Sequence, residues 1–396
     1  MAEDSGNTAA QRPKRRGRAR RRHVLATVLL STLLVLGLVV GLSTTYLYRH
    51  LNGNLTVVDI DRQLYDRPPT VHIDAPHQPL NILVMGSDSR DCDGCQIDGE
   101  SGGGSDTTIL FHLSADRQSA YGVSIPRDSL VDRPDCKDDD GEIIPGASDQ
   151  MWNAAYSLGG AACTMQQFEQ TTGIKATYFV VVDFASFQGM VDAVDGVEVC
   201  APEDIDSSEY GITIKKGTRT LRGKDALAYV RVRHGVGDGS DIGRIKRQQA
   251  FIGALVAKVL SGDTMTRPDR LVRFLSAATQ GLTTNSPSIK EMAEVGYQFK
   301  DIGLKRIRFI TVPFVYDGPR VRWTDEAAPL WQRLLHDQPL GELRDGSLGA
   351  NQVPGGDASS APADAPSSGG PSPSMAPPTD SVDASADELS SSGLCT

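Results

Sequence analysis

The arrangement of apolar and polar positions divides the chain into distinct regions. Residues 24–48 are almost entirely apolar and contain no charged side chain. Because a helix rises 1.5 Å per residue, a helix of this length crosses a hydrocarbon core of ~30 Å. The pattern therefore predicts one transmembrane helix over 24–48. From residue 78 onward, short apolar runs mix with amphipathic stretches, which is typical of a folded domain with both strands and helices.

Within that domain, the short apolar runs predict strands, and these lie at 81–85, 107–113, 120–125, 178–182, 197–200, 211–215 and 306–312. Amphipathic stretches predict helices in "MWNAAYSLGG", "AACTMQQFEQTTG", 184–194, "GKDALAYV", 270–280 and 289–299. A longer helix is expected to begin after Ser240, a good N-cap residue. The order is neither strictly alternating nor of one type, which predicts an α/β or α+β domain with a sheet between helices.

The regions on either side of this domain lack such patterns. Residues 49–77 contain Pro68, Pro69 and Pro76 and show no helical period, so we expect an extended stalk. After residue 346 the chain has no Lys or Arg and is rich in Ser, Pro, Ala and Gly. Such a composition buries too little apolar surface to offset the entropy of ordering. We expect a folded domain over 78–340 and a disordered acidic tail over 341–396.

Charge is distributed unevenly around the apolar run. The chain has a formal net charge of -10, yet residues 1–23 form a basic arm directly before it. A basic flank predicts that the N-terminus is cytoplasmic and that the domain lies outside the cell membrane, as in a single-pass signal-anchor protein. A cleaved signal peptide is the alternative, but the run exceeds an ordinary signal core. A nucleic-acid-binding arm is not needed to explain the arginines.

All six cysteines follow the apolar run, in the compartment where disulfides persist. Cys92 and Cys95 form a Cys-x-x-Cys pair, for which a local disulfide is favoured over zinc because no further ligands lie nearby. The pairing of the remaining cysteines, Cys136, Cys163, Cys200 and Cys395, stays open.

Charged side chains lie where the first three strands of the domain end or begin. If these strands form an up-down-up meander, Asp88, Arg90, Asp106, Arg127 and Asp128 meet at one edge of the sheet. Acids together with arginines are what a metal–phosphate site needs, since Mg²⁺ usually combines one or two carboxylates with water and phosphate. The alternative is that the acids are turn and cap residues paired with the arginines.

A second basic cluster occurs in "RVRHGVGDGSDIGRIKRQ". Arg231 and Arg233 are two residues apart, so in an extended segment they point to the same side. Arg244, Arg247 and Gln248 share one face near the start of the following helix, where like charges repel unless an anion lies between them. The planar guanidinium suits phosphate oxygens. A bound polyphosphate explains this cluster better than pairing with surface acids.

Several motifs resemble, in order and spacing, those of the LytR-CpsA-Psr family. They are "NILVMGSDSR", "SDTTIL", "SIPRDS", "WNAAYSLGG", "VDFASFQGMVDAVDGVEVC", "GKDALAYVRVRHGVGDGSDIGRIKRQQ" and "VPF". The resemblance is dense over 78–260 and looser to about 340. It implies a single-span, outward-facing bacterial membrane protein with an α/β/α sandwich around a mixed sheet. It also implies transfer of a glycopolymer from a polyprenyl-pyrophosphate carrier to a muramic acid hydroxyl of peptidoglycan.

The resemblance also implies roles for individual residues. Asp88 and Asp106 match the family's magnesium ligands, and Mn²⁺ would serve as well. The pyrophosphate-binding set matches Arg90, Arg127, Arg231, Arg233, Arg244 and Arg247, with Gln248 nearby. The departure is the long stretch between Asp88 and Asp106, which carries Cys92 and Cys95.

The expected chemistry follows from charge. Arginines and a metal ion would neutralise the pyrophosphate and stabilise the leaving polyprenyl phosphate. Arg127 would belong to this catalytic set, and Asp88, Asp106 and Asp128 are candidates by position for the base. The apolar faces of "FVVVDFASFQGMV" and "FIGALVAKVL" would line a tunnel for the prenyl chain or form ordinary core.

Two other functions remain compatible with the sequence. In a polyprenyl-pyrophosphate hydrolase, water would replace the sugar hydroxyl at the same groups. A non-enzymatic polyprenyl-phosphate-binding regulator of wall assembly would hold the lipid without turnover. A DNA-binding regulator conflicts with the predicted topology. The sequence leaves open which glycopolymer is moved.

Overall fold

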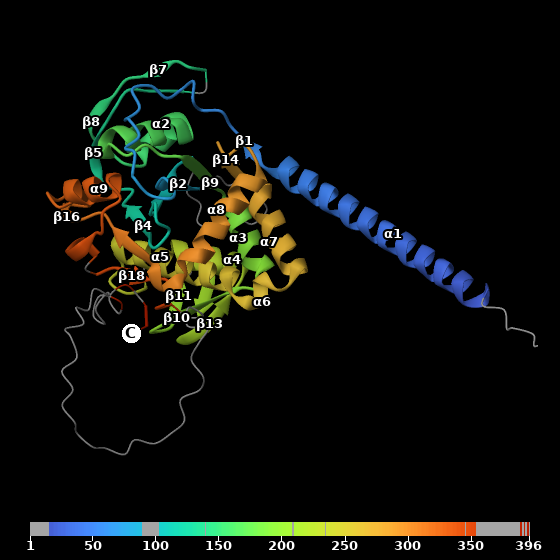
Figure 1. The fold of residues 1–396 in the computed structure, drawn as a ribbon. Coiled ribbons are helices and arrows are strands. Elements are labelled where there is room, and N and C mark those ends of the chain that lie inside the picture. Colours follow the sequence, from blue (N-terminus) through green and yellow to red (C-terminus); the bar gives the residue numbers. More distant parts are fainter. Residues whose placement is uncertain are drawn as a thin grey trace, which may run out of the picture. The chain divides into compact units, whose positions relative to one another are not determined.

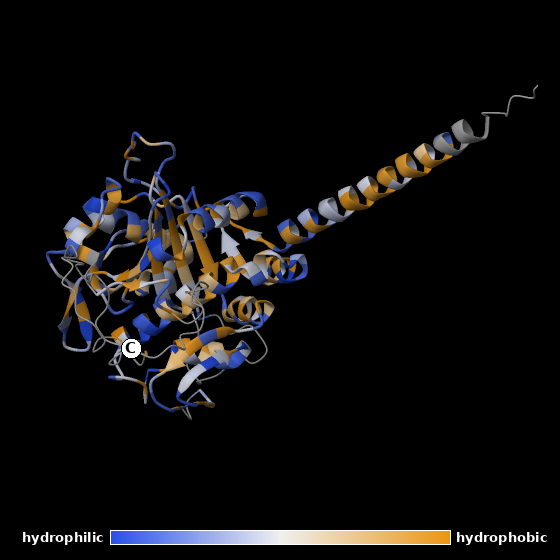
Figure 2. Ribbon diagram, turned by 60° about the horizontal axis from the view of Figure 1, so that its bottom comes forward, coloured by the Kyte–Doolittle hydropathy of each residue, from blue (hydrophilic) through white to orange (hydrophobic). Residues whose placement is uncertain are grey.

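The computed structural model describes residues 16–88, 103–138, 140–207, 210–233, 235–344 and 346–353, with Leu389, Ser392, Leu394 and Cys395 near the C-terminus. The chain divides into two units, residues 1–50 and 51–396. The first contains most of α1 (Arg16–Asn54), whose segment from His23 is long and apolar enough to cross a membrane. Figure 2 shows the hydrophobic residues that run along this helix. Among the described residues it is the one such helix, which suggests a membrane anchor.

The second unit is built on an eight-stranded sheet with the order β1-β14-β9-β2-β3-β4-β15-β18. Its strands are β1 (Thr56–Val57), β14 (Leu282–Thr284), β9 (Tyr178–Val182), β2 (Leu80–Ser87), β3 (Ser105–Leu113), β4 (Ala120–Ile125), β15 (Ile307–Thr311) and β18 (Leu348–Gly349). Strands β2, β3 and β4 pair antiparallel in sequence, as the predicted meander requires. Strand β9 is parallel to β2, and β15 is parallel to β4. The predicted mixed sheet is confirmed.

Helices cover both faces of this sheet (Figure 1). On one face α3 (Phe184–Ala193), α4 (Gly223–Arg231) and α5 (Asp241–Leu260) bury apolar side chains together with Leu113, Ala120 and Phe309. On the other, α2 (Ala154–Thr172) and α9 (Ala327–Leu335) pack with Leu83 and Leu110. Because successive strand side chains alternate between faces, β2 and β3 supply both cores. This is the predicted α/β/α sandwich.

The remaining elements surround these layers. The other helices are α6 (Gly262–Met265), α7 (Pro268–Gln280), α8 (Ile289–Ile302), η1 (Leu304–Arg306) and η2 (Gly341–Arg344). Five two-stranded sheets pair β5 (Leu130–Arg133) with β8 (Ala147–Met151), β6 (Cys136–Lys137) with β7 (Ile143–Ile144), β10 (Val197–Ala201) with β13 (Gly217–Leu221), β11 (Ile205–Ser207) with β12 (Ile212–Ile214), and β16 (Phe314–Asp317) with β17 (Arg320–Trp323).

Local sequence signals explain where two of the long helices begin and bend. Helix α5 starts after Ser240, as predicted, and the Ser240 hydroxyl accepts a hydrogen bond of 2.9 Å from the backbone N–H of Gly243. The two helices expected around "SLGG" form the single element α2, with a kink at Gly159 and Gly160. Gly160 has a φ of +57°, a conformation that glycine adopts without the clash that a Cβ would introduce.

Residues 51–77 are part of the folded unit, so the predicted stalk is wrong for this stretch. Ile60 and Leu64 are buried in the core beneath α2, and β1 joins the central sheet. Arg67 pairs with the buried carboxylate of Glu169 at 2.6 Å. Residues 49–54 continue α1, so the expected absence of a helix holds only beyond Asn54. An extended segment without helical period can still pack its apolar side chains against a core.

The predicted end of the domain at 340 is too early. Strand β18 pairs with β15, and Ala350 and Val353 are buried beside α5. Near the C-terminus, Leu394 is buried in the same core, and Cys395 forms a disulfide with Cys200. A second disulfide joins Cys136 to Cys163. Most of the predicted tail, residues 354–388, and the pair Cys92 and Cys95 lie outside the described residues.

We expect the Cys200–Cys395 disulfide to stabilise the folded unit, because it closes a loop with a sequence separation of 195 residues. Constraining the unfolded chain in this way contributes roughly 2–5 kcal/mol. Cys395→Ser is therefore expected to lower the melting temperature of the full-length protein in detergent by several degrees.

Cys200→Ser and the double variant are the controls, and both should melt at the same temperature as Cys395→Ser. If all three variants had the melting temperature of the wild type, the disulfide would not stabilise the fold.

Candidate functional site

The edge of the sheet where β2 ends brings the predicted acids and arginines together. Ser87, the last residue of β2, pairs with Ser105, the first residue of β3. Ile125, the last residue of β4, pairs with Thr108 of β3. Asp88, Asp106, Arg127 and Asp128 therefore lie at or just beyond the same edge, as the meander predicted. Arg90 lies outside the described residues.

Arg127 is the centre of this cluster. Its guanidinium donates a hydrogen bond to Asp106 Oδ1 and forms an ion pair with it. The Nε of Arg127 lies 3.7 Å from Asp241 Oδ1 and 3.9 Å from Asp128 Oδ1. The side chain of Arg127 is 15% exposed and that of Asp106 is 23% exposed, so water screens the pair only weakly. One guanidinium thus links β3, the segment after β4 and the start of α5.

Electrostatics keep this pair ionised. Burial raises the pKa of Asp106, but the charges of Arg127, Arg244 and Arg231, with the hydrogen bond from Arg127, hold it below its usual value. Burial likewise lowers the pKa of Arg127, and the neighbouring carboxylates of Asp106, Asp241 and Asp128 raise it above its usual value. Asp106 is therefore a carboxylate and Arg127 a cation at neutral pH.

Helix α5 adds a second, more deeply buried arginine. Arg244 is 3% exposed, and its Nη2 lies 2.7 Å from Asp241 Oδ1. This contact is an ion pair without hydrogen-bond geometry, and the Nε of Arg244 also has no hydrogen-bond partner within the described residues. Burial lowers the pKa of Arg244, while Asp241 opposes that effect. A buried guanidinium with unused donors beside a helix N-terminus favours an anionic ligand.

Arg231 is the last residue of α4, so the expectation of an extended segment at this position is wrong. It is buried, and its guanidinium carbon lies 4.5 Å from the ring centroid of Phe184 and 5.7 Å from that of Tyr210. Both distances permit cation–π attraction, which holds the charged group against apolar surface. Arg233 follows the helix and is half-buried.

The other two predicted residues of α5 have different surroundings. The Gln248 amide donates to the carbonyl of Val230 at 3.0 Å, and its oxygen accepts from the Thr107 hydroxyl at 3.3 Å. Arg247 is fully buried and donates to the carbonyls of Val232 and Ser392. The structure thus brings Gln248 to the cluster and uses Arg247 to join α5 to the C-terminal segment.

An apolar cavity of about 200 Å³ adjoins the charged cluster. Its polar lining comes from Ser87, Asp106, Thr107, Asp183, Arg231, Arg244 and Gln248, and Arg247 is not among the described residues that line it. Its apolar walls include Ile109, Phe111, Phe184, Phe187, Met190, Phe251, Ile252 and Leu255. Both stretches suggested for a prenyl tunnel contribute to these walls. The cavity therefore combines an apolar interior with charged groups, as an amphiphilic ligand requires.

Asp88 is held by the backbone of the loop that precedes β3. Its Oδ1 accepts hydrogen bonds from the N–H groups of Gly103 at 2.7 Å and Gly104 at 2.6 Å. The described residues contain no cluster of three or more His, Cys, Asp or Glu side chains suited to a metal. Asp88 and Asp106 supply the carboxylate oxygens that suit an ion such as Mg²⁺, which retains water and phosphate ligands.

The sequence interpretation missed Asp241, which contacts both Arg127 and Arg244. The available signal was its position, since an acid directly after the N-cap and three residues before Arg244 can pair with it along the helix. It also missed the cation–π contacts of Arg231 with Phe184 and Tyr210. Nothing in the local sequence indicates that these three segments lie close together.

Comparison with known proteins finds similarity over most of the chain. A profile of the LytR_cpsA_psr family matches residues 47–328. The cell wall biosynthesis protein LcpA of Corynebacterium glutamicum is 30% identical over 259 residues, which are 59% of this chain and 49% of that protein. The regulatory protein MsrR of Staphylococcus aureus is 29% identical over 238 residues, 59% of this chain and 64% of its own. The chain thus spans about half to two-thirds of the length of these relatives.

Solved structures share the fold. TagV of Bacillus subtilis superposes with a TM-score of 0.52 at 27% identity, covering 66% of this chain and 98% of TagV. TagT bound to LI-WTA superposes with a TM-score of 0.52 at 22% identity, covering 71% of this chain and 98% of TagT. The TagT similarity supports the fold alone.

We expect the Asp106–Arg127 pair to stabilise the fold in a pH-dependent way. Asp106→Asn should lower the free energy of unfolding by about 2–3 kcal/mol at pH 7, because it leaves the buried Arg127 without its closest carboxylate. Folding lowers the pKa of Asp106, so the contribution is complete above the ordinary value of 3.8 and is lost as the pH falls through the lower folded value. Denaturant unfolding of the wild type and of Asp106→Asn between pH 7 and about pH 3 measures the difference between their free energies of unfolding. This difference should decrease as the pH falls.

The matched control is Asp269→Asn, which removes an exposed partner of Arg273 at 3.3 Å. Exposed pairs contribute less than about 1 kcal/mol. The prediction would be contradicted if Asp106→Asn lowered the free energy of unfolding no more than Asp269→Asn does. A loss that does not change with pH would also contradict it.

Proposed function

Because the chain belongs to the LytR_cpsA_psr family, we propose that it is a membrane-anchored phosphotransferase of cell-wall assembly. It moves a glycopolymer from a polyprenyl-pyrophosphate carrier to a muramic acid hydroxyl of peptidoglycan and forms a phosphodiester. The observation that carries this proposal is the apolar cavity with Asp106, Arg231, Arg244 and Gln248 in its lining. A lipid linked to pyrophosphate has both an apolar chain and a dense negative charge, and it matches both parts of this site.

The binding step uses the contrast between the two parts of the cavity. Phe184, Phe187 and Ile252 line the apolar part and would surround the prenyl chain, for which burial contributes about 0.8 kcal/mol per CH₂ group. Arg231 and Arg244 would bind the pyrophosphate oxygens. The cost of desolvating these two guanidinium groups is already met in the folded protein, so they are preorganised for an anion.

The chemical step is a displacement at phosphorus. The muramic acid oxygen attacks the phosphorus next to the glycopolymer, and the bond from that phosphorus to the bridging oxygen breaks. Polyprenyl phosphate leaves with the bonding electron pair, and the hydroxyl proton passes to a carboxylate. Arg127 is held toward the sheet edge by Asp106 and would stabilise the charge that develops on the phosphoryl oxygens.

Asp88 and Asp106 would hold the Mg²⁺, or Mn²⁺, that the family implies. When bound, such an ion supplies additional positive charge to the pyrophosphate. Asp106 is a weak candidate for the base, because a carboxylate with a lowered pKa accepts a proton less readily. Asp88 and Asp128 remain the better-placed candidates.

The membrane topology is part of the same proposal. The basic arm, residues 1–23, lies before the apolar segment of α1 and favours a cytoplasmic N-terminus. The disulfides Cys136–Cys163 and Cys200–Cys395 favour an oxidising compartment for the folded unit. The catalytic unit would therefore face the cell wall, where peptidoglycan is available.

The test uses the full-length protein in lipid nanodiscs, with a polyprenyl-pyrophosphate-linked glycan, Mg²⁺ and peptidoglycan. Release of polyprenyl phosphate and attachment of glycan are measured together. Arg231→Ala should lower turnover by roughly 10²–10³-fold, because one preorganised cation at the phosphate is lost. Lys290→Ala on the exposed surface of α8 is the control and should leave turnover unchanged.

The products separate this proposal from the two alternatives. Release of polyprenyl phosphate without attachment of glycan to peptidoglycan would replace the transferase with a hydrolase. Tight binding of the carrier without either product would replace it with a lipid-binding regulator.

The apolar cavity should also make the reaction sensitive to carrier length. In the wild type, the KM for the carrier should fall severalfold or more with each added isoprene unit until the cavity is full, because each unit buries further apolar surface. Ile252→Trp fills part of the cavity and should remove this dependence. Steady-state kinetics with carriers of increasing length measure it, and an unchanged dependence in the variant would contradict the assignment of the cavity to the prenyl chain.

A further inference from the structure

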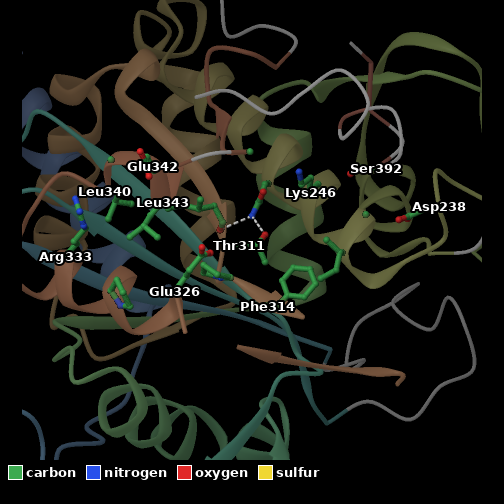
Figure 3. Close-up of a pocket in the computed structure, with 18 residues that line it drawn as sticks. Asp238, Lys246, Thr311, Phe314, Glu326, Arg333, Leu340, Glu342, Leu343 and Ser392 are labelled. Carbon is green, nitrogen blue, oxygen red and sulfur yellow. Dashed lines mark hydrogen bonds between the residues drawn. The ribbon is translucent and has the colours of Figure 1, made fainter. Parts of the chain in front are cut away.

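A second and larger cavity, of about 1030 Å³, lies beside α5 (Figure 3). Its walls come from the first turns of α5, the end of β15 with the segment after it, α9, and the region around η2. The residues that define its chemistry are Asp238, Lys246, Phe314, Glu326, Arg333 and Glu342. The reaction proposed above does not assign this space to either part of the lipid carrier.

Helix α5 contributes different side chains to the two cavities. Ile242, Lys246 and Gln249 line the large cavity, whereas Arg244 and Gln248 line the apolar one. These two sets follow helical spacing and form separate stripes of the same helix. Both stripes flank the first turn of α5, where Asp241 contacts Arg127 and Arg244.

The strands place the large cavity at the same end of the sheet as Arg127. Thr311, in its wall, pairs with Ser124 of β4, and Arg127 lies three residues after Ser124. The neighbouring wall residues Pro313 and Phe314 continue beyond β15 in the same direction. A molecule in this cavity would therefore lie at the same end of the sheet as the Arg127 cluster.

One wall of the large cavity is held by hydrogen bonds. The buried amide of Gln249 donates to Ser124 Oγ at 2.9 Å, to the carbonyl of Ile310 at 3.1 Å and to Thr311 Oγ1 at 3.1 Å. Figure 3 shows the two contacts of this amide with the lining residues Ile310 and Thr311. On the opposite wall, Arg333 donates to the carbonyl of Pro339 at 2.6 Å. The cavity is thus bounded by fixed polar groups.

The charges that line the cavity exclude some ligands and favour others. Two cations, Lys246 and Arg333, accompany three acids, Asp238, Glu326 and Glu342. The acids oppose a polyphosphate, and the many charged groups oppose a prenyl chain. A hydroxyl-rich ligand that carries both carboxylate and ammonium groups matches this lining, and Phe314 offers an apolar surface for the face of a sugar ring.

We propose that this cavity is the acceptor subsite, which binds a peptide-substituted amino sugar of peptidoglycan and directs its hydroxyl toward the phosphorus held beside Arg127. Lys246 and Arg333 bind carboxylates of the peptide, and Glu326 binds its ammonium group. The assignment rests on the proposed transferase function. It gives the two substrates separate cavities, both lined by residues of α5.

The first test measures binding alone. A soluble disaccharide–peptide fragment of peptidoglycan is titrated into the full-length protein in nanodiscs by calorimetry, without carrier. Lys246→Ala and Glu326→Gln should each raise the Kd about tenfold or more, because each removes a charged hydrogen-bonding group. The matched controls are Lys290→Ala and Glu294→Gln, an exposed pair of α8 separated by 3.7 Å, and they should leave the Kd unchanged.

The second test uses the complete reaction. In Lys246→Ala and Glu326→Gln, the KM for the peptidoglycan acceptor should rise about tenfold, while the KM for the lipid carrier stays at the wild-type value. Thermal melting of each variant at the wild-type temperature confirms that the fold is retained.

The outcomes separate this inference from the proposed function. Normal transfer, with fragment affinity and acceptor KM unchanged in both variants, would overturn the acceptor subsite and leave the transferase in place. Failure of the wild type to bind the fragment would also overturn it. Fragment binding that depends on Lys246 and Glu326 in a protein without transfer activity would support the subsite while removing the transferase.

Discussion

The ion pairs of Arg127 determine how the functional elements meet. Asp106 comes from β3, Asp128 follows β4, and Asp241 begins α5, and all three carboxylates lie around one guanidinium. Because this group is largely buried, its charge has to be met by these partners more than by water. The position of α5 relative to the sheet edge is therefore tied to the charge balance of the site.

This arrangement shows how the chain keeps several buried arginines at one site. Arg231 and Arg244 lie in surroundings where water cannot screen them, and each is held by a different means. Arg231 lies over the rings of Phe184 and Tyr210, and Arg244 forms an ion pair with Asp241. Each arrangement neutralises the cation only partly. The remaining positive potential is what a pyrophosphate would bind.

Helix α5 separates two kinds of environment. Its Arg244 and Gln248 belong to the cavity with apolar walls, and its Lys246 and Gln249 belong to the cavity with mixed charges. On another side of α5, Arg247 donates hydrogen bonds to the carbonyls of Val232 and Ser392 and so holds the helix to these segments. The C-terminal segment, tied by the Cys200–Cys395 disulfide, is thereby part of the support of this helix. Residues that line the cavities and residues that make structural contacts alternate along a few turns.

Local sequence determined the elements and the sheet edge. The apolar run of α1, the meander of β2, β3 and β4, and the start of α5 at Ser240 depend on periodicity and capping, which act between near neighbours. Asp106 and Arg127 were predictable for the same reason, since short connections fix which strand ends meet. Tertiary structure decided what lies against these residues. Residues 55–77 and 347–353 have no periodic signal, and only the apolar surfaces they cover explain the burial of Ile60, Leu64, Leu348, Ala350 and Val353. Likewise, Arg244 and Arg247 share a helix and a charge, but contacts with distant segments direct one to the cavity and the other to backbone carbonyls. Long-range packing and desolvation set that difference, and neither is encoded in the spacing of neighbouring residues.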